Sequence, residues 1–442
     1  MIVLVAVVLL FVVGAMAALS IDIVTLYTAR SEAQLAADAG ALAGARVFAN
    51  SGVTSDAGRR STRNARNLAT MIATQVAAQN IVGGRTLNPV AGAGEIKVSF
   101  DQTDTAFDTN PHVTVQTQRT DLPTFFARIW GRTANTVTAS ATAEAYNPSG
   151  ANASNSGPAI PVAPSCVKPW LLPNVDPTQA SASGPTIFSS STGAITASTL
   201  VGKYWPNGPV ATPNTNGIYS LCNAGDCSVG KGGITPPLPG AYYPGDPASF
   251  SPTAAAPASC SGSFNSYQLS IAGCVQTPIS CGTNPNNINI DINPYVAVNG
   301  SRDADTVAAA SCLIHYVNGP GDSDSVDTAT TQPPLQFVAG NQNPVVTAAT
   351  NIMVSDSLVT IPVINTTPGF DPTNPVQIIG FLQVFLNPSA SSTMPYAPAG
   401  TASPYEMSAM IINMAGCGTS AAGQPIFGNG ASPVAVRLIT PP

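Results

Sequence analysis

The pattern of apolar and polar positions opens with one long uninterrupted helical signal. Residues 2–21 carry no charge and are mostly Val, Leu, Ile, Ala and Phe. At 1.5 Å per residue, this run makes a helix of about 30 Å, the hydrocarbon thickness of a bilayer. Residues 31–48 contain no Pro and are rich in Ala and Leu. The pattern therefore predicts one continuous helix, half in a membrane and half outside it.

A mixed pattern follows this helix. Leu68, Ile72 and Val76 stand at four-residue spacing, which predicts an amphipathic helix over residues 55–80 with Ser55 as its N-cap. Apolar and polar residues alternate at 96–100, 113–116 and 135–146, which is typical of strands. Residues 123–130 predict a short helix between the last two strands. This order predicts an α+β unit over residues 20–146.

The remaining chain has a different pattern of apolar and polar residues. Residues 147–165 are rich in Asn, Ser, Pro and Gly, which predicts a linker. Residues 166–442 hold short apolar runs bounded by turn residues, which predicts a β-rich domain. Its clearest strands are residues 357–365 and 376–386, and its one helix candidate is residues 304–316. The expected fold class is α+β, with a transmembrane anchor at 1–21, the unit at 20–146, the linker and this outer domain.

Charge is sparse and unevenly divided. Charged residues make up 9 % of the chain and hydrophobic residues 44 %, against a charged fraction of about 25 % in ordinary soluble domains. Residues 1–146 hold 11 Lys and Arg against 10 Asp and Glu, a net of +1, whereas residues 147–442 hold 5 against 12, a net of −7. Because nucleic-acid binding needs clustered cations, an acidic second half does not favour that partner.

All eight cysteines lie beyond residue 165, and their even number behind an apolar span predicts disulfides in an oxidising compartment; free buried thiols are the alternative. Spacing favours Cys222 with Cys227, and Cys260 with Cys274 or Cys281, but leaves the connectivity open. A single Cys-x4-Cys with only two histidines does not favour zinc. The set is Cys166, Cys222, Cys227, Cys260, Cys274, Cys281, Cys312 and Cys417.

The first 21 residues allow two interpretations. A signal peptide has a cationic start and an apolar stretch of about 7–15 residues, and this run has neither feature, so we expect a retained anchor. Arg30 and Arg46 follow the span, which formally favours the opposite orientation. The cysteines favour an extracytoplasmic location for the bulk of the chain, and a basic leader before Met1 would remove the conflict.

Small residues recur along the helix beyond the span. Such a face lets two backbones approach closely. Two interpretations remain open: the face packs against other copies in an assembly, or it packs within this protein's own α+β unit. The residues of the face are Ala33, Ala37, Ala41 and Ala45, with Gly40 and Gly44 beside them.

The run LSIDIVTLYTARSEAQLAADAGALAGARVF resembles the N-terminal signature of the Flp (Tad) pilus-assembly TadE/TadG-like family. That family shows an apolar span, a short acidic and aromatic segment, an Arg, and a small-residue stretch. The family usually carries a cationic segment before the span, and this chain lacks one. The matching positions are Asp22, Tyr27, Arg30, Gln34, Ala36, Ala37, Asp38, Ala39, Ala41, Leu42, Ala43, Gly44 and Ala45.

The resemblance implies a pilin-like layout for residues 20–146 and a membrane-anchored, non-enzymatic structural role in assembling or presenting Flp-type pili. Its implied partners are the membrane, other pilus-assembly or pilin-like proteins, and further copies of the chain. Its implied location is the inner membrane, single-pass, with the bulk of the chain outside. The von Willebrand-type adhesion domain of some relatives is not expected, because Asp-x-Ser-x-Ser after an apolar strand is absent. An unrelated extracytoplasmic binding protein and an envelope hydrolase are the alternatives.

Chemistry-bearing residues are few. Asp322, Asp324 and Asp327 stand in a turn-rich stretch and are candidate calcium ligands; a solvated acidic turn is the other interpretation. No further cofactor is expected. His112 and His315 lack an accompanying nucleophile motif, and no hydrolase, metalloprotease, P-loop or dinucleotide signature is present. We therefore expect no enzyme.

Overall fold

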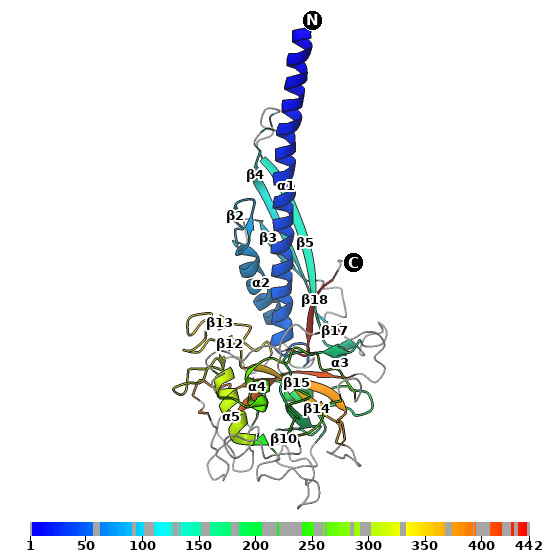
Figure 1. The fold of residues 1–442 in the computed structure, drawn as a ribbon, viewed down its shortest axis with the longest axis vertical. Coiled ribbons are helices and arrows are strands. Elements are labelled where there is room, and N and C mark those ends of the chain that lie inside the picture. The colour runs from blue at the N-terminus through cyan, green and yellow to red at the C-terminus, as the bar shows by residue number, and fades with distance from the viewer. Residues whose placement is uncertain are drawn as a thin grey trace, which may run out of the picture.

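The chain forms an elongated molecule in which a stalk carries a globular head (Figure 1). The fold is α+β, as predicted. The computed structural model describes residues 2–55, 62–90, 94–100, 110–124, 126, 131, 134–151, 160–177, 185–205, 219–220, 241–251, 260, 263–282, 287–291, 302–327, 333–366, 374–391, 393–394, 407–417, 426–427 and 432–439.

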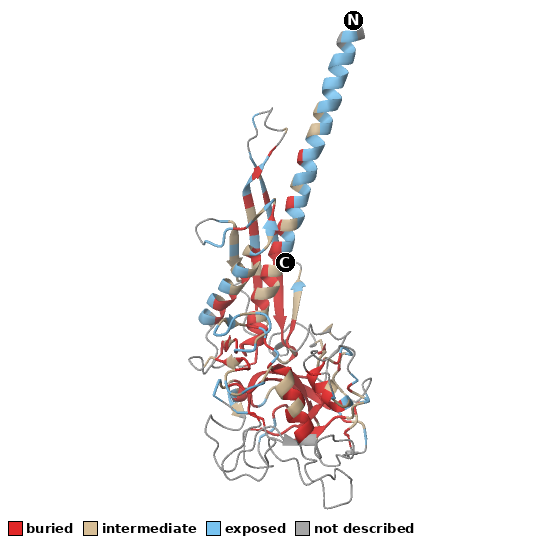
Figure 2. Cartoon of the chain, turned by 60° about the vertical axis from the view of Figure 1, so that its left-hand side comes forward, coloured by how far each residue is buried: buried red, intermediate tan, exposed pale blue. Residues whose placement is uncertain are grey.

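The stalk is organised by α1, Ile2–Asn50, one unbroken helix of 49 residues. At 1.5 Å per residue it is about 74 Å long. Its apolar first part projects free of the other elements and is exposed, whereas its second part is buried against them (Figure 2). Among the described residues, α1 alone has the length and apolar composition needed to cross a membrane. The predicted continuous helix is confirmed.

A helix, a short hairpin and an antiparallel sheet of the described chain pack around the second part of α1. The helix α2, Thr62–Ala78, runs beside α1, and the hairpin of β1, Ile81–Val82, with β2, Arg85–Thr86, follows it. The sheet has the order β18-β5-β4-β3. Its strands are β3, Ile96–Ser99, β4, His112–Pro123, β5, Ala134–Tyr146, and β18, Ala435–Ile439.

The alternation that predicted strands at 96–100, 113–116 and 135–146 corresponds to β3, β4 and β5. Val113 and Val115 of β4 face the helices and are fully buried, while Thr114 between them is partly exposed. Of the helix predicted at 123–130, Pro123 belongs to the end of β4, and residue 125 and residues 127–130 lie outside the described part of the chain.

The β4–β5 hairpin reaches back along α1 to the end of the apolar run. There the Asp22 carboxylate, which is buried, accepts a hydrogen bond of 3.0 Å from the backbone N–H of Phe126. Asp22 is the first charged residue after the apolar segment. The connection between β4 and β5 therefore reaches the level at which the apolar span ends.

The head is built on a mixed sheet of seven strands in the order β8-β16-β15-β14-β7-β10-β9. The predicted strands at 357–365 and 376–386 are β14, Leu358–Ile364, and β15, Ile378–Leu386. Every residue of β14, β15 and β16 is buried, because both faces of these strands are covered. The other strands are β7, Trp170–Pro173, β8, Tyr204–Trp205, β9, Tyr219–Ser220, β10, Ala241–Pro244, and β16, Ala409–Gly416.

Short elements complete the head. The helix α4, Ser266–Ala272, begins with a capping box in which the Asn265 and Gln268 side chains each bind the other's backbone N–H. It packs beside α5, Arg302–Leu313, which corresponds to the helix predicted at 304–316. The remaining pieces are α3, Pro148–Ala151, η3, Ser198–Leu200, the pair β6, Val162–Ala163, with β17, Ile426–Phe427, and the sheet of β11, Ser325–Val326, β12, Phe337–Val338, and β13, Asn351–Ile352.

Three disulfides join segments of the head that are distant in sequence: Cys166–Cys274, Cys260–Cys312 and Cys281–Cys417. The prediction that Cys260 pairs with Cys274 or Cys281 is wrong. Cys260 instead meets Cys312 on α5, because packing of α4 against α5 brings them together. Cys222 and Cys227 lie outside the described residues. The bridges span 52 to 136 residues, so they close long loops.

The end of the chain returns to the stalk. β18 pairs antiparallel with β5, from Ala435 opposite Tyr146 to Ile439 opposite Thr142. The predicted outer domain over 166–442 thus contributes its last strand to the sheet of the anchored unit. The described ends of the predicted linker, 147–151 and 160–165, carry α3 and β6.

A candidate docking groove between stalk and head

The stalk enters the head through a buried polar network at the end of α1. The Asn50 amide donates to Met353 O at 2.9 Å, and its oxygen accepts from Gln383 Nε2 at 3.3 Å. Asn413 of β16 donates to Ala49 O and, at 2.8 Å, to Gln383 Oε1. Buried polar groups cost free energy unless they are paired, and here each amide finds partners on the other unit. The network therefore fixes the helix end in the head.

Ser55 is part of the same network. Its hydroxyl donates to Asn413 Oδ1 at 3.1 Å and accepts from the backbone N–H of Met414 at 2.9 Å. Residues 56–61, where the helix predicted after Ser55 would start, lie outside the described residues, and α2 is described over Thr62–Ala78. The Ser55 side chain is bound to the edge of β16. This contact adds a second attachment of the stalk to the head.

The small-residue face of α1 lies inside the stalk. Ala33, Ala37, Ala41 and Ala45 are at most 1 % exposed. A Cβ added at Gly40 would lie 3.1 Å from Ala77 Cβ of α2, and one at Gly44 would lie 2.9 Å from Val113 Cγ1 of β4. The face thus packs within its own α+β unit, and buried side chains there cannot contact a second copy at the same time.

The candidate calcium ligands do not converge in the structure. The Asp322 carboxylate accepts hydrogen bonds from the backbone N–H groups of Val317, Asn318 and Gly319, and these bonds lower its pKa. Among the described residues, no group of three or more Asp, Glu, His or Cys side chains is placed to hold a metal ion.

Asp324 has a different role, as the centre of a loop network. Its Oδ1 accepts from Gly340 N at 2.9 Å and from Asn343 Nδ2 at 3.0 Å, and its Oδ2 accepts from Ser355 Oγ at 2.6 Å. The Asn343 oxygen in turn accepts from the N–H groups of residues 345 and 346 at 3.0 Å each. One buried carboxylate therefore connects the loop at 340–346 with the loop at 353–356.

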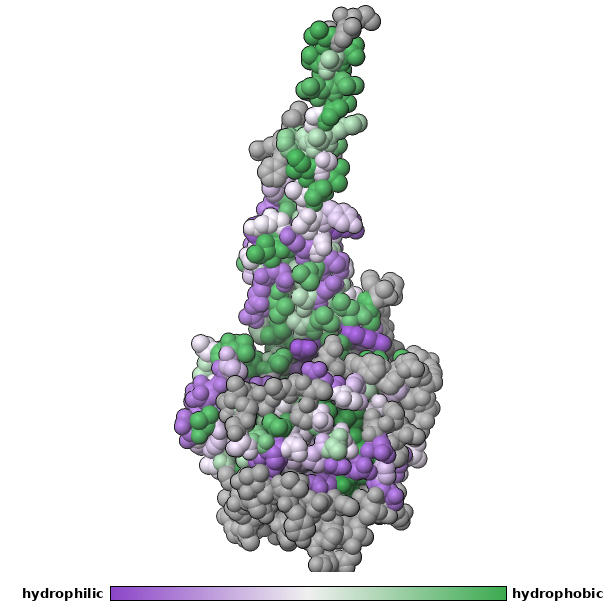
Figure 3. All heavy atoms as spheres, viewed as in Figure 1, coloured by the Kyte–Doolittle hydropathy of each residue, from purple (hydrophilic) through white to green (hydrophobic). Residues whose placement is uncertain are grey.

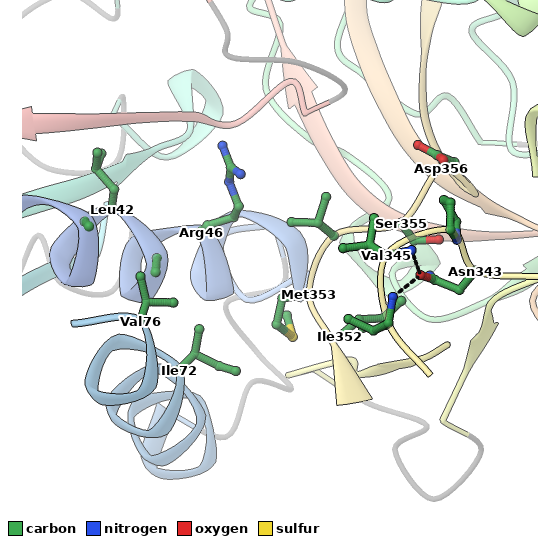
Figure 4. A pocket seen from close by; sticks show the side chains of 15 residues that line it. Leu42, Arg46, Ile72, Val76, Asn343, Val345, Ile352, Met353, Ser355 and Asp356 are labelled. Carbon is green, nitrogen blue, oxygen red and sulfur yellow. Dashed lines mark hydrogen bonds between the residues drawn. The ribbon is translucent and has the colours of Figure 1, made fainter. Parts of the chain in front are cut away.

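These two loops form one wall of a groove of about 660 Å³ (Figure 4). The opposite wall comes from the stalk: Leu42 and Arg46 of α1, and Ile72 and Val76 of α2. The groove is largely apolar, because the head contributes mainly aliphatic side chains and Met353. Its lining residues are Ala39, Leu42, Ala43, Arg46, Ile72, Val76, Asn343, Pro344, Val345, Val346, Ile352, Met353, Val354, Ser355 and Asp356.

Two valines are held outward at this groove. Val345 is 86 % exposed and Val354 is 59 % exposed. The hydrogen bonds that the Asp324 carboxylate and the Asn343 side-chain oxygen accept fix the loop backbones, so these side chains do not fold back onto the head. An apolar surface kept open by a satisfied polar network is preorganised for contact, because little conformational entropy remains to be lost on binding.

Charged groups line the groove as well. The Asp356 carboxylate lies 3.0 Å from His315 Nε2. Arg46 borders both this groove and a neighbouring hollow of about 400 Å³. The Arg46 guanidinium forms no hydrogen bond or ion pair with any residue that the structure describes. Sequence reasoning missed this site, since no local signal distinguishes an open groove from a covered one.

The two histidines occupy separate places. His315 pairs with Asp356 on the head, and His112 lies on β4 opposite Glu144 of β5. His315 has a positive φ of 59°, in the turn that follows α5. The structure does not bring the two rings together in one site.

Comparison with known proteins gives one finding. Residues 1–47 match the family model described as "Putative Flp pilus-assembly TadE/G-like". The resemblance carried by the N-terminal segment is thus confirmed over that range, which covers the apolar span and most of the stalk helix. No curated protein matches the chain. No solved structure matches it.

Proposed function

We propose, starting from its TadE/G-like N-terminal segment, that this chain is a membrane-anchored, non-enzymatic structural component of Flp-type pilus assembly or presentation. The family match ties the chain to pilus assembly. The observation that carries the structural role is the continuity of α1, which passes without a break from an apolar span through the stalk into the polar network of the head.

The proposed membrane anchor is supported by the exposure of the apolar side chains in the first part of α1 as well as by their composition. The apolar side chains of the first part of α1 cover the projecting end of the molecule, while polar residues gather farther down the stalk (Figure 3). In water such a surface would be costly, since each exposed aliphatic side chain forgoes about 1.5–3 kcal/mol of burial. A bilayer removes that cost, which is why we assign this segment to the membrane.

The head is assigned to the extracytoplasmic side of the inner membrane. Three disulfides brace it, and disulfides persist where the environment is oxidising. The stalk contains no cysteine at all, since every cysteine lies beyond residue 165.

The test is genetic replacement in the cells that encode the chain. Deleting it should abolish surface filaments, counted by electron microscopy. The full chain should restore them, whereas a version with residues 2–21 replaced by a cleaved signal peptide should not, because its head is no longer anchored. Normal filaments in the deletion strain would refute the pilus role. Full restoration by the released form would refute the anchored role.

A further inference from the structure

The apolar outer surface of α1 continues past the predicted span. Ile23 is 56 % exposed, Val24 is 63 % exposed and Tyr27 is 78 % exposed. Asp22 interrupts the apolar sequence, but its side chain is buried and its carboxylate accepts a backbone N–H from the stalk. The charge that ends the uncharged run therefore faces inward, and the next charged residue of α1 is Arg30.

The hydroxyl groups at this level are bound within the helix itself. Ser20 Oγ donates to the carbonyl three residues before it at 2.7 Å, and Thr25 Oγ1 does the same at 2.8 Å. Thr28 Oγ1 donates to Val24 O at 3.0 Å. Such bonds satisfy a hydroxyl without water, as they do for Ser and Thr in helices that lie in lipid. These exposed polar residues therefore leave the surface compatible with a bilayer.

The end of β4 stands beside the same turns of α1. Leu122 is buried in one small cluster with Ala29. Pro123, which follows Leu122, is exposed, and Phe126 is half-buried where its N–H meets the inward-facing carboxylate of α1. Both ribbon views show β4 and β5 extending toward the N-terminal end of α1 (Figures 1 and 2). The sheet thus brings an exposed proline and a half-buried phenylalanine to the level at which the apolar span ends.

The nearest charged group on β4 is held by two arginines. The Asp121 carboxylate lies 2.6 Å from Arg119 Nε and 3.1 Å from Arg85 Nη2. A paired charge costs less free energy near a layer of low dielectric than an isolated one does, because its partner replaces part of the lost hydration. Asp121 therefore marks the limit of the uncharged surface on the strand without opposing contact with lipid beyond it.

The dimensions place this surface in the headgroup layer of a bilayer. A bilayer with a hydrocarbon core of about 30 Å is about 40–45 Å thick in all, so each headgroup layer is about 5–7 Å deep. From Asp22 to Leu26, α1 rises by about 6 Å. Helix side chains tilt toward the N-terminus, so the Tyr27 ring reaches back toward the span. An aromatic ring with a polar tip is the side chain typical of this layer.

We infer that the stalk has a second membrane contact, a collar that lies in the headgroup layer and binds bilayer lipid. The collar consists of Ile23, Val24 and Tyr27 of α1 with Pro123 and Phe126 beside them. The bilayer then holds the end of the sheet as well as the helix, so tilting the stalk would pull part of the collar out of lipid. This inference rests on one part of the proposed function, the membrane anchor, and not on the pilus role.

Lipid is the occupant because it already surrounds the span that the collar continues. The surface passes from the span into the collar without an outward-facing charge, so the same solvent covers both. A stable protein interface buries about 800 Å² on each partner. The few side chains of the collar, along about 6 Å of helix, do not supply that area.

The experiment is photocrosslinking of the full chain, reconstituted in vesicles of phosphatidylethanolamine and phosphatidylglycerol. The photoreactive residue p-benzoylphenylalanine replaces Tyr27 or Pro123 in the collar. A probe at Leu10, which is 78 % exposed in the span, is the positive control. The matched controls are Leu35, 63 % exposed on α1 about 12 Å beyond Tyr27, and Val345, 86 % exposed on the head. Mass spectrometry identifies each adduct and the lipid carbon to which the probe is joined.

We expect lipid adducts at Leu10, Tyr27 and Pro123. The yield at each collar probe should exceed the yields at Leu35 and Val345 by at least about tenfold, because the headgroup layer ends before both control positions. The Leu10 probe should join carbons within the acyl chains. The two collar probes should join the glycerol or the acyl carbons next to it.

Four results would overturn the inference: no lipid adduct at Tyr27, no lipid adduct at Pro123, equal yields at the collar and at Leu35, or protein adducts in place of lipid at the collar. An adduct at Leu10 in these cases would leave the membrane anchor intact. No adduct at Leu10 would refute the anchor and the collar together. Retention of the three disulfides and of the helical circular dichroism signal shows that each variant is folded.

Discussion

At the residue scale, Lys168 has the most unusual chemistry among the described side chains. It is 4 % exposed, and its ammonium donates hydrogen bonds to Ile271 O at 2.5 Å and Gly273 O at 2.8 Å, at the end of α4. Burial disfavours the charged form and lowers the pKa of Lys168 from 10.5 to about 7, which Asp356 opposes only in part. A cation that binds helix-terminal carbonyls is thus close to losing its charge at neutral pH.

Lys168 should make the head more stable as pH rises. Its folded pKa of about 7 lies below the unfolded value of 10.5, so between these limits the unfolded state binds more protons than the folded state. Its destabilising effect is complete below pH 7 and is lost as pH rises to 10.5. Denaturant unfolding of the full chain should show a gain of roughly 2 kcal/mol from pH 7 to pH 9.

Lys168→Met should abolish this gain, because Met does not titrate. Lys203→Met, which replaces an exposed lysine, is the matched control and should keep the wild-type slope. A slope that survives in the Lys168→Met protein would show that another group causes the pH dependence.

At the scale of elements, β18 connects the end of the chain to the stalk. Val434 and Ala435 are nearly fully buried there, and Arg437 lies 3.2 Å from Glu144 and over the Tyr146 ring at 5.4 Å. Without this strand, β5 would be the edge of the sheet with unpaired backbone groups. The last strand of the chain is therefore part of the stalk core.

Removing residues 433–442 should open this edge. We expect hydrogen exchange of the amides at 142–146 to become at least about tenfold faster, because β5 loses its β18 partner. Removing residues 440–442 alone leaves β18 whole and should change nothing at these amides. Unchanged protection in the longer truncation would mean that β18 does not stabilise β5.

The elements that were predicted correctly each have a local sequence pattern of their own. An uncharged run without proline specified α1, and alternation specified β3, β4, β5, β14 and β15. By contrast, β18 is only five residues long, AVRLI, and pairs with a strand some 290 positions earlier. The disulfide partners are separated by 52 residues or more. Such pairings depend on the tertiary fold, which no local pattern contains.

For the candidate site, too, the sequence showed the residues but not their tertiary contacts. The small-residue repeat of α1 was visible in sequence, but its partner, the chain's own α2 and β4, was not. Asp324 was visible as an acid in a turn, but its role in joining two loops depends on Asn343 and Ser355, 19 and 31 positions away. The position of Arg46 at the groove could not be predicted from the sequence, because the groove forms only when the stalk and the head pack together.

At the scale of the whole molecule, the polar network makes stalk and head one unit. Asn413 is fully buried and contacts Ala49 O, Gln383 and Ser55. Replacing it leaves those buried groups without partners, and each orphaned group costs about 1–3 kcal/mol. The junction should therefore depend strongly on this one side chain.

Asn413→Leu should lower the free energy of unfolding by about 2–4 kcal/mol and split one cooperative transition into separate stalk and head transitions. Calorimetry of the full chain in detergent micelles measures both effects. Asn365→Leu, which removes an exposed hydrogen bond of 2.9 Å to Gln377, is the control and should cost less than about 0.5 kcal/mol. Equal effects of the two substitutions would contradict a coupling role for the network.

The unbroken course of α1 also has a consequence for rotation. The helix has no proline from Ile2 to Asn50, its second half packs against a sheet whose β4–β5 connection reaches Asp22, and its end is bound in the head. No swivel separates the span from the head along this path. In the proposed membrane anchor, turning the span about its axis must turn the head through the same angle. The rotation of the span about its own axis therefore sets the direction in which the head faces.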